Sequence, residues 1–369
     1  MPGPVKLLFV TDHDRAALQQ RVALADAARK AGCEVWIAAP DARQATIIKN
    51  FGFNYSRYPL SLPGSNVAGL YKLYHEVKPD LVHHFSVPSI FPASLVPRLH
   101  KNMAVVTTVT GKGIAFLDQK QARFLDKLPS CRAIFHTPEA RQLFVESGVV
   151  TSEQARLIRG TGVDCTWFKP SDVQGDPDKP VILLASNMDW DQGIKEFVGA
   201  ARRVRAKKPN ARFVLANTEE AGPEAVPISQ MKAWTREGFV EWWGYIKNKA
   251  QVMQEATIVT LPAYEPRGVP RELLEGAASG RPLIATDRPG CQEIVRNGIT
   301  GTLIPPYDSQ ALANAILGLL NDPETAERYG QAGRTLAVNQ FSQELVFNET
   351  IGLYKELLME RFPEKVEQV

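Results

Sequence analysis

Cysteine is scarce in this chain, and its four copies stand far apart. The 369 residues contain Cys33, Cys131, Cys165 and Cys291, with no CxxC pair and no histidine at the spacing of a zinc site. Disulfide scaffolds and structural zinc sites depend on close, regularly spaced cysteines, so neither is expected. The four thiols are predicted to be buried and free, in a reducing, cytoplasmic compartment.

Long hydrophobic runs and a dominant charge are also missing. No stretch approaches the roughly 20 apolar residues that a membrane-spanning helix needs. The early run Val5–Val10 is too short for a secretory signal. Lys and Arg total 43 against 40 Asp and Glu, a net charge of +3, which predicts no nucleic-acid partner. The composition is that of an ordinary globular protein.

Short apolar runs alternate with amphipathic segments along the whole chain. Continuous apolar runs are typical of strands buried on both faces of a parallel sheet, and the amphipathic segments predict helices between them. The expected strands are residues 5–10, 34–40, 80–85, 104–110, 132–136, 155–159, 180–185, 211–216, 257–262, 281–286 and 302–305. This βαβ rhythm predicts an α/β fold of the doubly wound, Rossmann-like type.

The rhythm occurs twice, and the chain length suits two domains. A polar stretch with three prolines separates the halves, so we expect one domain over residues 1–168, a linker over 169–179 and a second domain over 180–345. Two such domains facing each other would leave a cleft at the carboxyl ends of their sheets, where open α/β sheets place ligands.

Residues 261–275 (LPAYEPRGVPRELLE) predict a strand, a turn and a helix. Gly268 permits a close approach of the backbone, and Pro270 suits the first helical turn. The free amides of that turn predict an anion site suited to phosphate. Glu275, one turn further in, can accept hydrogen bonds from two ribose hydroxyls. From spacing alone, a plain loop–helix joint with a solvated Glu275 stays open.

Residues 263–306 resemble the nucleotide-sugar signature of the family 4 glycosyltransferases, which are retaining enzymes of the two-domain GT-B fold. Five more segments resemble elements of the same family: residues 6–40, 79–85 (PDLVHHF), 110–116 (TGKGIAF), 134–170 and 341–358. The resemblance therefore covers nearly the whole chain. It implies that the C-terminal helix, residues 346–369, packs back on the N-terminal domain.

The resemblance implies an acceptor in the N-terminal domain and a nucleotide-diphosphate sugar, UDP- or GDP-linked, in the C-terminal domain. It implies transfer of a hexosyl or N-acetylhexosaminyl unit to a glycan acceptor, commonly polyprenyl-linked, in surface polysaccharide synthesis. No metal or other cofactor is implied. The expected protein is cytoplasmic, peripheral at the inner face of the membrane, and a monomer or homodimer.

The resemblance also assigns residues to roles. Donor contacts are expected from Glu275, Gly268, Val269, Pro270, Leu274, Asn187, Gln192 and Tyr245. Acceptor contacts are expected from Arg21, His84, Gly111, Lys112 and Gly113. Candidate catalytic residues are Glu265, Arg267 and His13. A surface position without function is the alternative for His13, and a plain turn is the alternative for residues 110–113.

Two departures from the family pattern concern charge. The first carboxylate of the family's E-x7-E pair is replaced by Arg267, so Glu265 could serve only if its loop bulges. The family's diphosphate-binding Arg and Lys are replaced by Asn187 and Gln192. Losing one preorganised donor of this kind costs about 10²–10³ in rate. Arg267 is the hypothetical replacement for one of the missing cations.

Because of these departures, two other classes of protein function stay open. One is a degenerate GT-B protein that binds a ligand or partner without catalysis, and the other is a GT-B sugar-nucleotide epimerase. A phosphorylase is disfavoured because no lysine-bearing cofactor motif is visible. A basic run, Arg202, Arg203, Arg205, Lys207 and Lys208, is predicted to be a solvated helix face, with contact to anionic lipid headgroups as the weaker alternative.

Overall fold

The computed structural model describes residues 3–11, 15–39, 42–57, 65–85, 103–109, 131–171, 176–217, 225–265 and 268–366. The chain divides into two compact units. The first combines Met1–Arg159 with Val346–Val369, and the second is Gly160–Leu345.

The first unit is built on a parallel sheet of seven strands in the order β3-β2-β1-β4-β5-β6-β7. Every neighbouring pair is parallel. The strands are β1 (Lys6–Val10), β2 (Glu34–Ala39), β3 (Asn54–Arg57), β4 (Leu81–His84), β5 (Ala104–Val109), β6 (Cys131–Phe135) and β7 (Ala155–Leu157).

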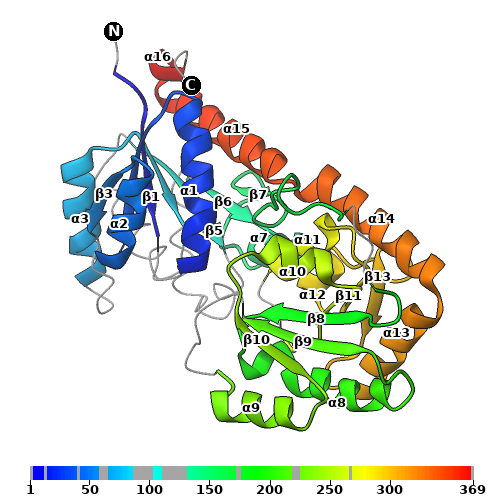
Figure 1. Ribbon diagram of the computed structural model, residues 1–369. Coiled ribbons are helices and arrows are strands. Elements are labelled where there is room, and N and C mark those ends of the chain that lie inside the picture. The colour runs from blue at the N-terminus through cyan, green and yellow to red at the C-terminus, as the bar shows by residue number, and fades with distance from the viewer. Residues whose placement is uncertain are drawn as a thin grey trace. The chain divides into compact units, whose positions relative to one another are not determined.

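Helices cover both faces of this sheet (Figure 1). One hydrophobic cluster joins the sheet to α1 (Arg15–Lys30), α2 (Ala42–Asn50) and the part of α15 (Gln343–Arg361) that belongs to this unit. The other cluster joins it to α3 (Ser65–Val77) and α7 (Pro138–Glu146). A short helix, α16 (Pro363–Val366), ends the described chain.

The C-terminal helix α15 is tied to the first sheet by packing and by ion pairs. Its buried positions follow a helical spacing: Val346, Phe347, Thr350, Leu353, Tyr354, Leu357 and Leu358. Arg132 of β6 pairs with Glu360 at 2.6 Å and with Glu356 at 3.6 Å, and Lys365 of the following helix α16 pairs with Asp80 at 2.8 Å. The seven buried positions form one stripe along the helix, which is how it can pack against a sheet distant in sequence.

The second unit has a parallel sheet of six strands in the order β10-β9-β8-β11-β12-β13. The strands are β8 (Val181–Ser186), β9 (Arg212–Asn217), β10 (Glu241–Tyr245), β11 (Ile258–Leu261), β12 (Leu283–Thr286) and β13 (Gly301–Ile304). One face carries α10 (Lys249–Glu255), α11 (Arg271–Ala278), α12 (Pro289–Gln292) and α14 (Pro323–Phe341). The other carries α8 (Ile194–Arg205), α9 (Ile228–Arg236) and α13 (Ser309–Asn321). The predicted fold class, two doubly wound α/β domains, is confirmed.

The division between the units lies earlier than the expected linker at residues 169–179. The backbone of Val163 accepts from Gln343 and donates to Phe341, each at 2.9 Å. Arg334 donates to the carbonyls of Cys165 and Phe168 at 2.9 and 2.7 Å. Residues 160–168 are therefore bound to α14 and belong to the second unit.

Two adjacent histidines at the end of β4 are buried. His83 bonds through Nδ1 to the Tyr354 hydroxyl (2.5 Å) and through Nε2 to Thr108 Oγ1 (2.7 Å), and His84 bonds through Nε2 to the Tyr74 hydroxyl (2.6 Å). Burial lowers the pKa of His83 well below its ordinary value and that of His84 to about 3. Both rings are therefore neutral in the folded protein at neutral pH.

Acid should consequently destabilise the first unit. The unfolded chain binds protons at these histidines below a pKa of about 6.5, whereas the folded chain does not, so the free energy of unfolding falls with pH through that window. For His84 alone we expect a loss of about 2 kcal/mol between about pH 7 and about pH 5. Hydrogen exchange of the β4 and β5 amides across this range measures it.

The matched variants are His84→Gln and His75→Gln, since His75 is exposed on α3. The first should lose the His84 share of the acid sensitivity, and the second should keep it. Equal pH dependence in both variants would contradict the assignment.

Candidate functional site

A buried carboxylate lies near the start of α11, beyond the carboxyl end of β11. Gly268 in the connecting loop has φ of +79°, and Pro270 caps the helix. Glu275 is only 2% exposed, and its Oε1 lies 3.5 Å from Nη2 of Arg271 one turn before it. Burial, and then the charge of Glu275, raise the pKa of the neighbouring Glu272. At this place the carboxylate can accept hydrogen bonds from the hydroxyls of a nucleotide. The free amides at the start of the helix can donate to the phosphate of the same nucleotide.

Close backbone contacts hold the loops at this edge of the sheet. A Cβ at Gly290 of α12 would lie 1.8 Å from the Gly268 carbonyl oxygen, so these two segments touch backbone to backbone. Thr286 donates through Oγ1 to the carbonyl of Ala263 at 2.5 Å. The loops after β11 and β12 are therefore fixed against each other.

The loop after β8 carries the two positions where the resemblance predicts cations. The Asn187 amide donates to the Asp189 carboxylate, and Gln192 Nε2 donates to Asp191 Oδ1 at 2.9 Å. The backbone N–H of Tyr264 donates to the Asp191 carbonyl at 2.8 Å, which joins this loop to the one after β11. Both amides are thus engaged by carboxylates, and the loop itself carries negative charge.

Three described cations lie on elements around these loops, and each has a contact of its own. Arg271 is paired with Glu275, Arg288 donates through Nε to the Tyr264 carbonyl at 3.0 Å, and Lys195 Nζ lies 4.8 Å from the Trp190 ring centre.

Tyr264 and Tyr307 form a ring pair that the sequence did not reveal. Their ring centres are 4.0 Å apart, and the Tyr264 hydroxyl donates to Glu196 Oε2 at 2.6 Å. Burial and then this bond raise the pKa of Tyr264. Tyr307 has φ of +60° and is 64% exposed. A bulky residue in the left-handed region is uncommon outside functional or strained sites; the turn sequence Pro305-Pro306-Tyr307-Asp308 was the available signal.

Two expected donor contacts are corrected by the structure. The side chains of Val269 and Leu274 belong to the buried core of the second unit, where both pack beside Gly160. Their apolar side chains face inward because α11 must bury one face against the sheet. They support the loop and do not present their side chains to a ligand. Tyr245, at the end of edge strand β10, is 62% exposed, and Glu265 is also exposed.

In the first unit, the expected acceptor residues also have structural roles. Arg21 is buried, donates to the Phe85 carbonyl at 3.4 Å and lies 5.2 Å from the centre of its ring. The prediction for His84 is wrong for its side chain, which is fully buried and bonded to Tyr74. The remaining predicted residues lie outside the described part of the chain: His13, Gly111, Lys112, Gly113 and Arg267.

Gly193 controls the spacing of the loops after β8 and β11. It has φ of +74°, and a Cβ there would lie 2.1 Å from the Pro262 carbonyl oxygen. Gly193→Ala should therefore lower the free energy of unfolding of the second unit by about 3 kcal/mol or more, from clash and backbone strain together. Urea unfolding measures the loss.

Gly238→Ala is the matched control, because Gly238 has φ of +81° with no atom near its missing Cβ. It should cost only the backbone strain, about 1 kcal/mol. Equal losses in the two variants would show that the contact with Pro262 is unimportant.

Two family models match most of the chain. The model described as "Glycosyl transferase 4-like" matches residues 6–137, and the one described as "Glycosyl transferases group 1" matches residues 179–322. Each match lies within one unit, and the second includes all six strands and α11.

Individual proteins are similar over part of their length. An alpha-maltose-1-phosphate synthase of Mycobacterium tuberculosis is 31% identical over 197 residues, 49% of this chain and 49% of that protein. The N,N'-diacetylbacillosaminyl-diphospho-undecaprenol alpha-1,3-N-acetylgalactosaminyltransferase of Campylobacter jejuni is 23% identical over 55% of this chain and 54% of that protein. The chain thus spans about half the length of the curated relatives it matches.

Solved structures share the fold over nearly the whole chain. Anabaena Alr3699/HepE in complex with UDP has a TM-score of 0.79 at 17% identity, covering 95% of this chain and 100% of that one. Among the helices that the structure describes, none is long and apolar enough to cross a membrane.

Proposed function

The chain belongs to the family 4 glycosyltransferases of GT-B fold, and we propose that it transfers a hexosyl or N-acetylhexosaminyl unit from a nucleotide-diphosphate sugar to a glycan acceptor. The observation that carries the proposal is Glu275, a buried carboxylate one turn into α11, behind a glycine loop at the carboxyl edge of a parallel sheet. Open α/β sheets bind nucleotides at this edge.

Within this proposal the donor is UDP- or GDP-linked and the acceptor is polyprenyl-linked, in surface polysaccharide synthesis. The names of two similar proteins support these choices: one was solved with UDP, and another acts on a diphospho-undecaprenol substrate. A protein with such an acceptor would work at the inner face of the membrane, bound peripherally. We propose a monomer or homodimer.

The proposed reaction retains the anomeric configuration. The bond between the anomeric carbon and the phosphate oxygen breaks, and the acceptor oxygen bonds to the same face of that carbon. The acceptor proton passes to the departing phosphate, so no separate base is needed. Glu275 would hold the ribose and the amides of α11 the phosphate, with no metal required. Glu265, Arg267 and His13 remain predicted contributors to catalysis.

A second candidate function follows from the loop after β8. Asn187 and Gln192 stand where the family has cations, and both are bonded to aspartates. Unless other groups compensate for this charge, an ordinary diphosphate would be bound weakly. The alternative is therefore a protein that uses the same fold to bind a partner or ligand without sugar transfer.

Replacing Glu275 tests the nucleotide site. Glu275→Gln keeps the shape but removes the charged acceptor of the ribose hydroxyls, so the affinity for UDP should fall about tenfold or more. Calorimetric titration with UDP, GDP and their sugars measures it. Glu255→Gln, on the exposed side of α10, is the control and should bind as the unmodified protein does. Unchanged UDP affinity in the Glu275 variant would refute the assigned role.

Restoring the missing cations separates transferase from binding protein. Asn187→Arg with Gln192→Lys should raise UDP affinity about tenfold or more if a diphosphate binds at this loop, because two charged donors are added. Asn314→Arg with Gln331→Lys adds the same charge at exposed positions of α13 and α14 and is the control.

An equal gain in the control pair would show a non-specific effect of net charge. Nucleotide binding that appears only in the restored variant would favour the second candidate function. Sugar transfer by the unmodified protein, followed with labelled UDP-sugars, would exclude it.

A further inference from the structure

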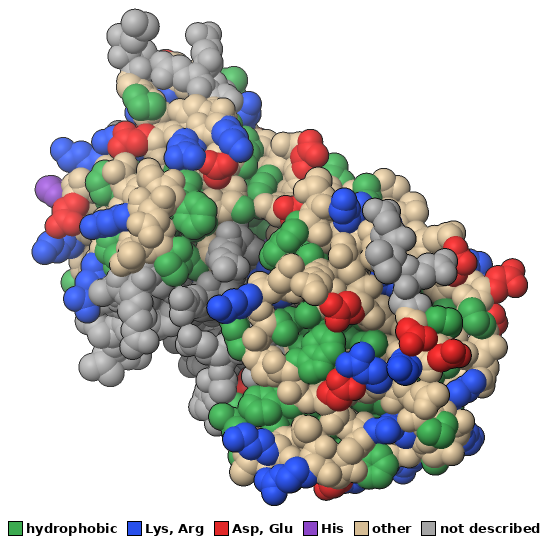
Figure 2. Space-filling view, viewed as in Figure 1, with side chains coloured by type: hydrophobic (Ala, Val, Ile, Leu, Met, Phe, Trp, Pro, Cys, Tyr) green, Lys and Arg blue, Asp and Glu red, His purple; other side chains and the backbone are tan. Residues whose placement is uncertain are grey.

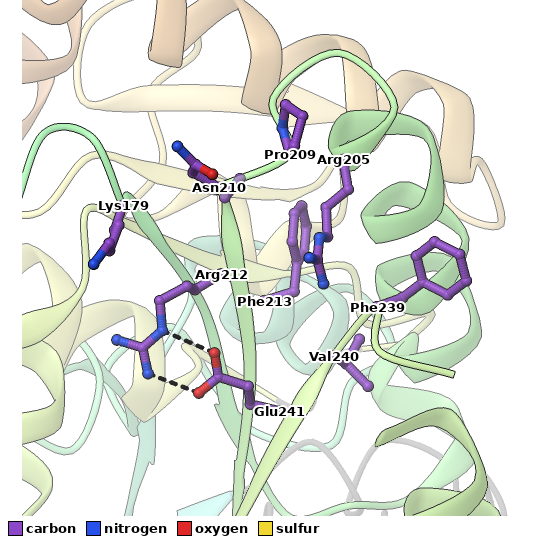
Figure 3. Close-up of a pocket in the computed structure, with 10 residues that line it drawn as sticks. Lys179, Arg205, Pro209, Asn210, Arg212, Phe213, Phe239, Val240 and Glu241 are labelled. Atoms are coloured by element: carbon purple, nitrogen blue, oxygen red, sulfur yellow. Dashed lines mark hydrogen bonds and ion pairs between the residues drawn. The ribbon is translucent and has the colours of Figure 1, made fainter. Parts of the chain in front are cut away.

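A concave site lies at the amino edge of the sheet of the second unit, where the strands begin. Its volume is about 270 Å³. It is lined by Lys179 before β8, by Arg205 at the end of α8, and by Arg212 and Glu241 at the first positions of β9 and β10 (Figure 3). All strands of this sheet run parallel, so the pocket lies at the opposite end of the strands from the start of α11, the helix that carries Glu275.

The lining carries three cationic side chains and one carboxylate. Arg212 neutralises that carboxylate with two parallel bonds, from Nε and Nη2 to Glu241 at 2.8 and 2.7 Å. Within the part of the chain that the structure describes, neither Lys179 nor Arg205 forms an ion pair. The pocket therefore has an excess of two positive charges.

The two arginines also have donors to spare. Arg212 uses Nε and Nη2 for Glu241, so its Nη1 group can donate to a ligand. Arg205 uses Nη1 for the Gly238 carbonyl, so its Nε and Nη2 groups can donate to a ligand. Phe213 and Val240, which also line the pocket, are buried in the hydrophobic core between the sheet and α8. The donors are thus anchored on a rigid base, as recognition of a polyatomic anion requires.

Cations near a helix C-terminus have an ordinary explanation, since they offset the helix dipole. That explanation fits the other two arginines at the end of α8. Arg202 pairs with Glu237. Arg203 donates through Nε to Gln310 Oε1 at 2.9 Å and through Nη1 to the Gly199 carbonyl at 3.0 Å. Arg205 differs because it lines the pocket.

We propose that this pocket binds a phosphate group, carried by a small phosphomonoester or by an anionic lipid headgroup. A phosphomonoester carries about −1.5 to −2 charges near neutral pH, which matches the excess of two. The volume leaves room for a small group beside the phosphate, and Phe239 and Pro209 offer it apolar contact. The site is separate from the proposed nucleotide site.

The surroundings suit either source of the phosphate. Lys207 and Lys208 follow α8 directly. Along the lower edge of the second unit in Figure 2, over α8 and α9, basic side chains are frequent. Such cations strengthen the attraction of a charged membrane surface by about 1 kcal/mol each, and they also attract a free anion.

The test compares two probes on the full chain. Glycerol 3-phosphate is titrated by calorimetry, and vesicles of phosphatidylcholine, with or without phosphatidylglycerol, are used in co-sedimentation. Lys179→Ala with Arg205→Ala should weaken binding of the effective probe about tenfold or more, because two charged donors are lost. Arg203→Ala, on the same helix but outside the pocket, is the control. Saturating UDP should leave the binding unchanged.

Binding of glycerol 3-phosphate that the double variant loses identifies a free phosphomonoester as the ligand class. Binding only to vesicles with phosphatidylglycerol, again lost in the double variant, identifies a lipid headgroup. The proposal is overturned if neither probe binds, if Arg203→Ala weakens binding as much as the double variant, or if UDP displaces the probe. Because these outcomes do not require sugar transfer, they are independent of the proposed function.

Discussion

Backbone contacts too close for any side chain organise the carboxyl edge of the second sheet. Gly193 lies against the Pro262 carbonyl, and Gly290 lies against the Gly268 carbonyl. These contacts set the positions of three loops, after β8, β11 and β12, and hence of the start of α11. Protein interiors are packed densely enough that a shift in one such contact moves its neighbours. The place of Glu275 relative to the loop of Asn187 and Gln192 depends on them.

Charge at that edge is balanced locally and not by the chain as a whole. Asp189 and Asp191 hold the amides of Asn187 and Gln192, while Arg271 pairs with Glu275. A net charge of +3 over the whole chain says nothing of this arrangement. The two amides can still donate to a phosphate, but they lack the positive charge that an Arg or Lys would add to such a bond.

The strands were predictable where they form continuous apolar runs, and two of the four strands at sheet edges, β3 and β10, were missed. All eleven expected strands are present, because a continuous apolar run has few alternatives in a protein of this class. β3 was missed, since its four residues are exposed or half-buried and form no apolar run. β10 was missed as well, because its residues are half-buried or exposed at an edge of the sheet. Glu275 was predicted from its spacing in the motif; the structure shows that it is buried on α11, and its role in binding stays a prediction. Its neighbours Val269 and Leu274 were misassigned because a motif does not say which face of a helix turns inward.

The features that could not be predicted from the sequence are contacts between segments that are distant along the chain. The contacts of the tyrosine pair join three segments, which carry Glu196, Tyr264 and Tyr307. The cations of the pocket come from three other segments, which carry Lys179, Arg205 and Arg212. In a parallel sheet, every strand brings the loop before it to one edge and the loop after it to the other. Residues far apart in sequence therefore gather at both edges, yet ligand sites are expected at only one of them. In this protein the pocket at the amino edge has three cations and one carboxylate. At the carboxyl edge the described cations Arg271, Arg288 and Lys195 lie on elements that also carry carboxylates. The same topology thus provides two groups of loops on one domain. The carboxyl edge has the position that the family motif predicts, but Asn187 and Gln192 stand there in place of the expected cations. The amino edge has a pocket in which cations outnumber carboxylates, at a position that no motif predicts.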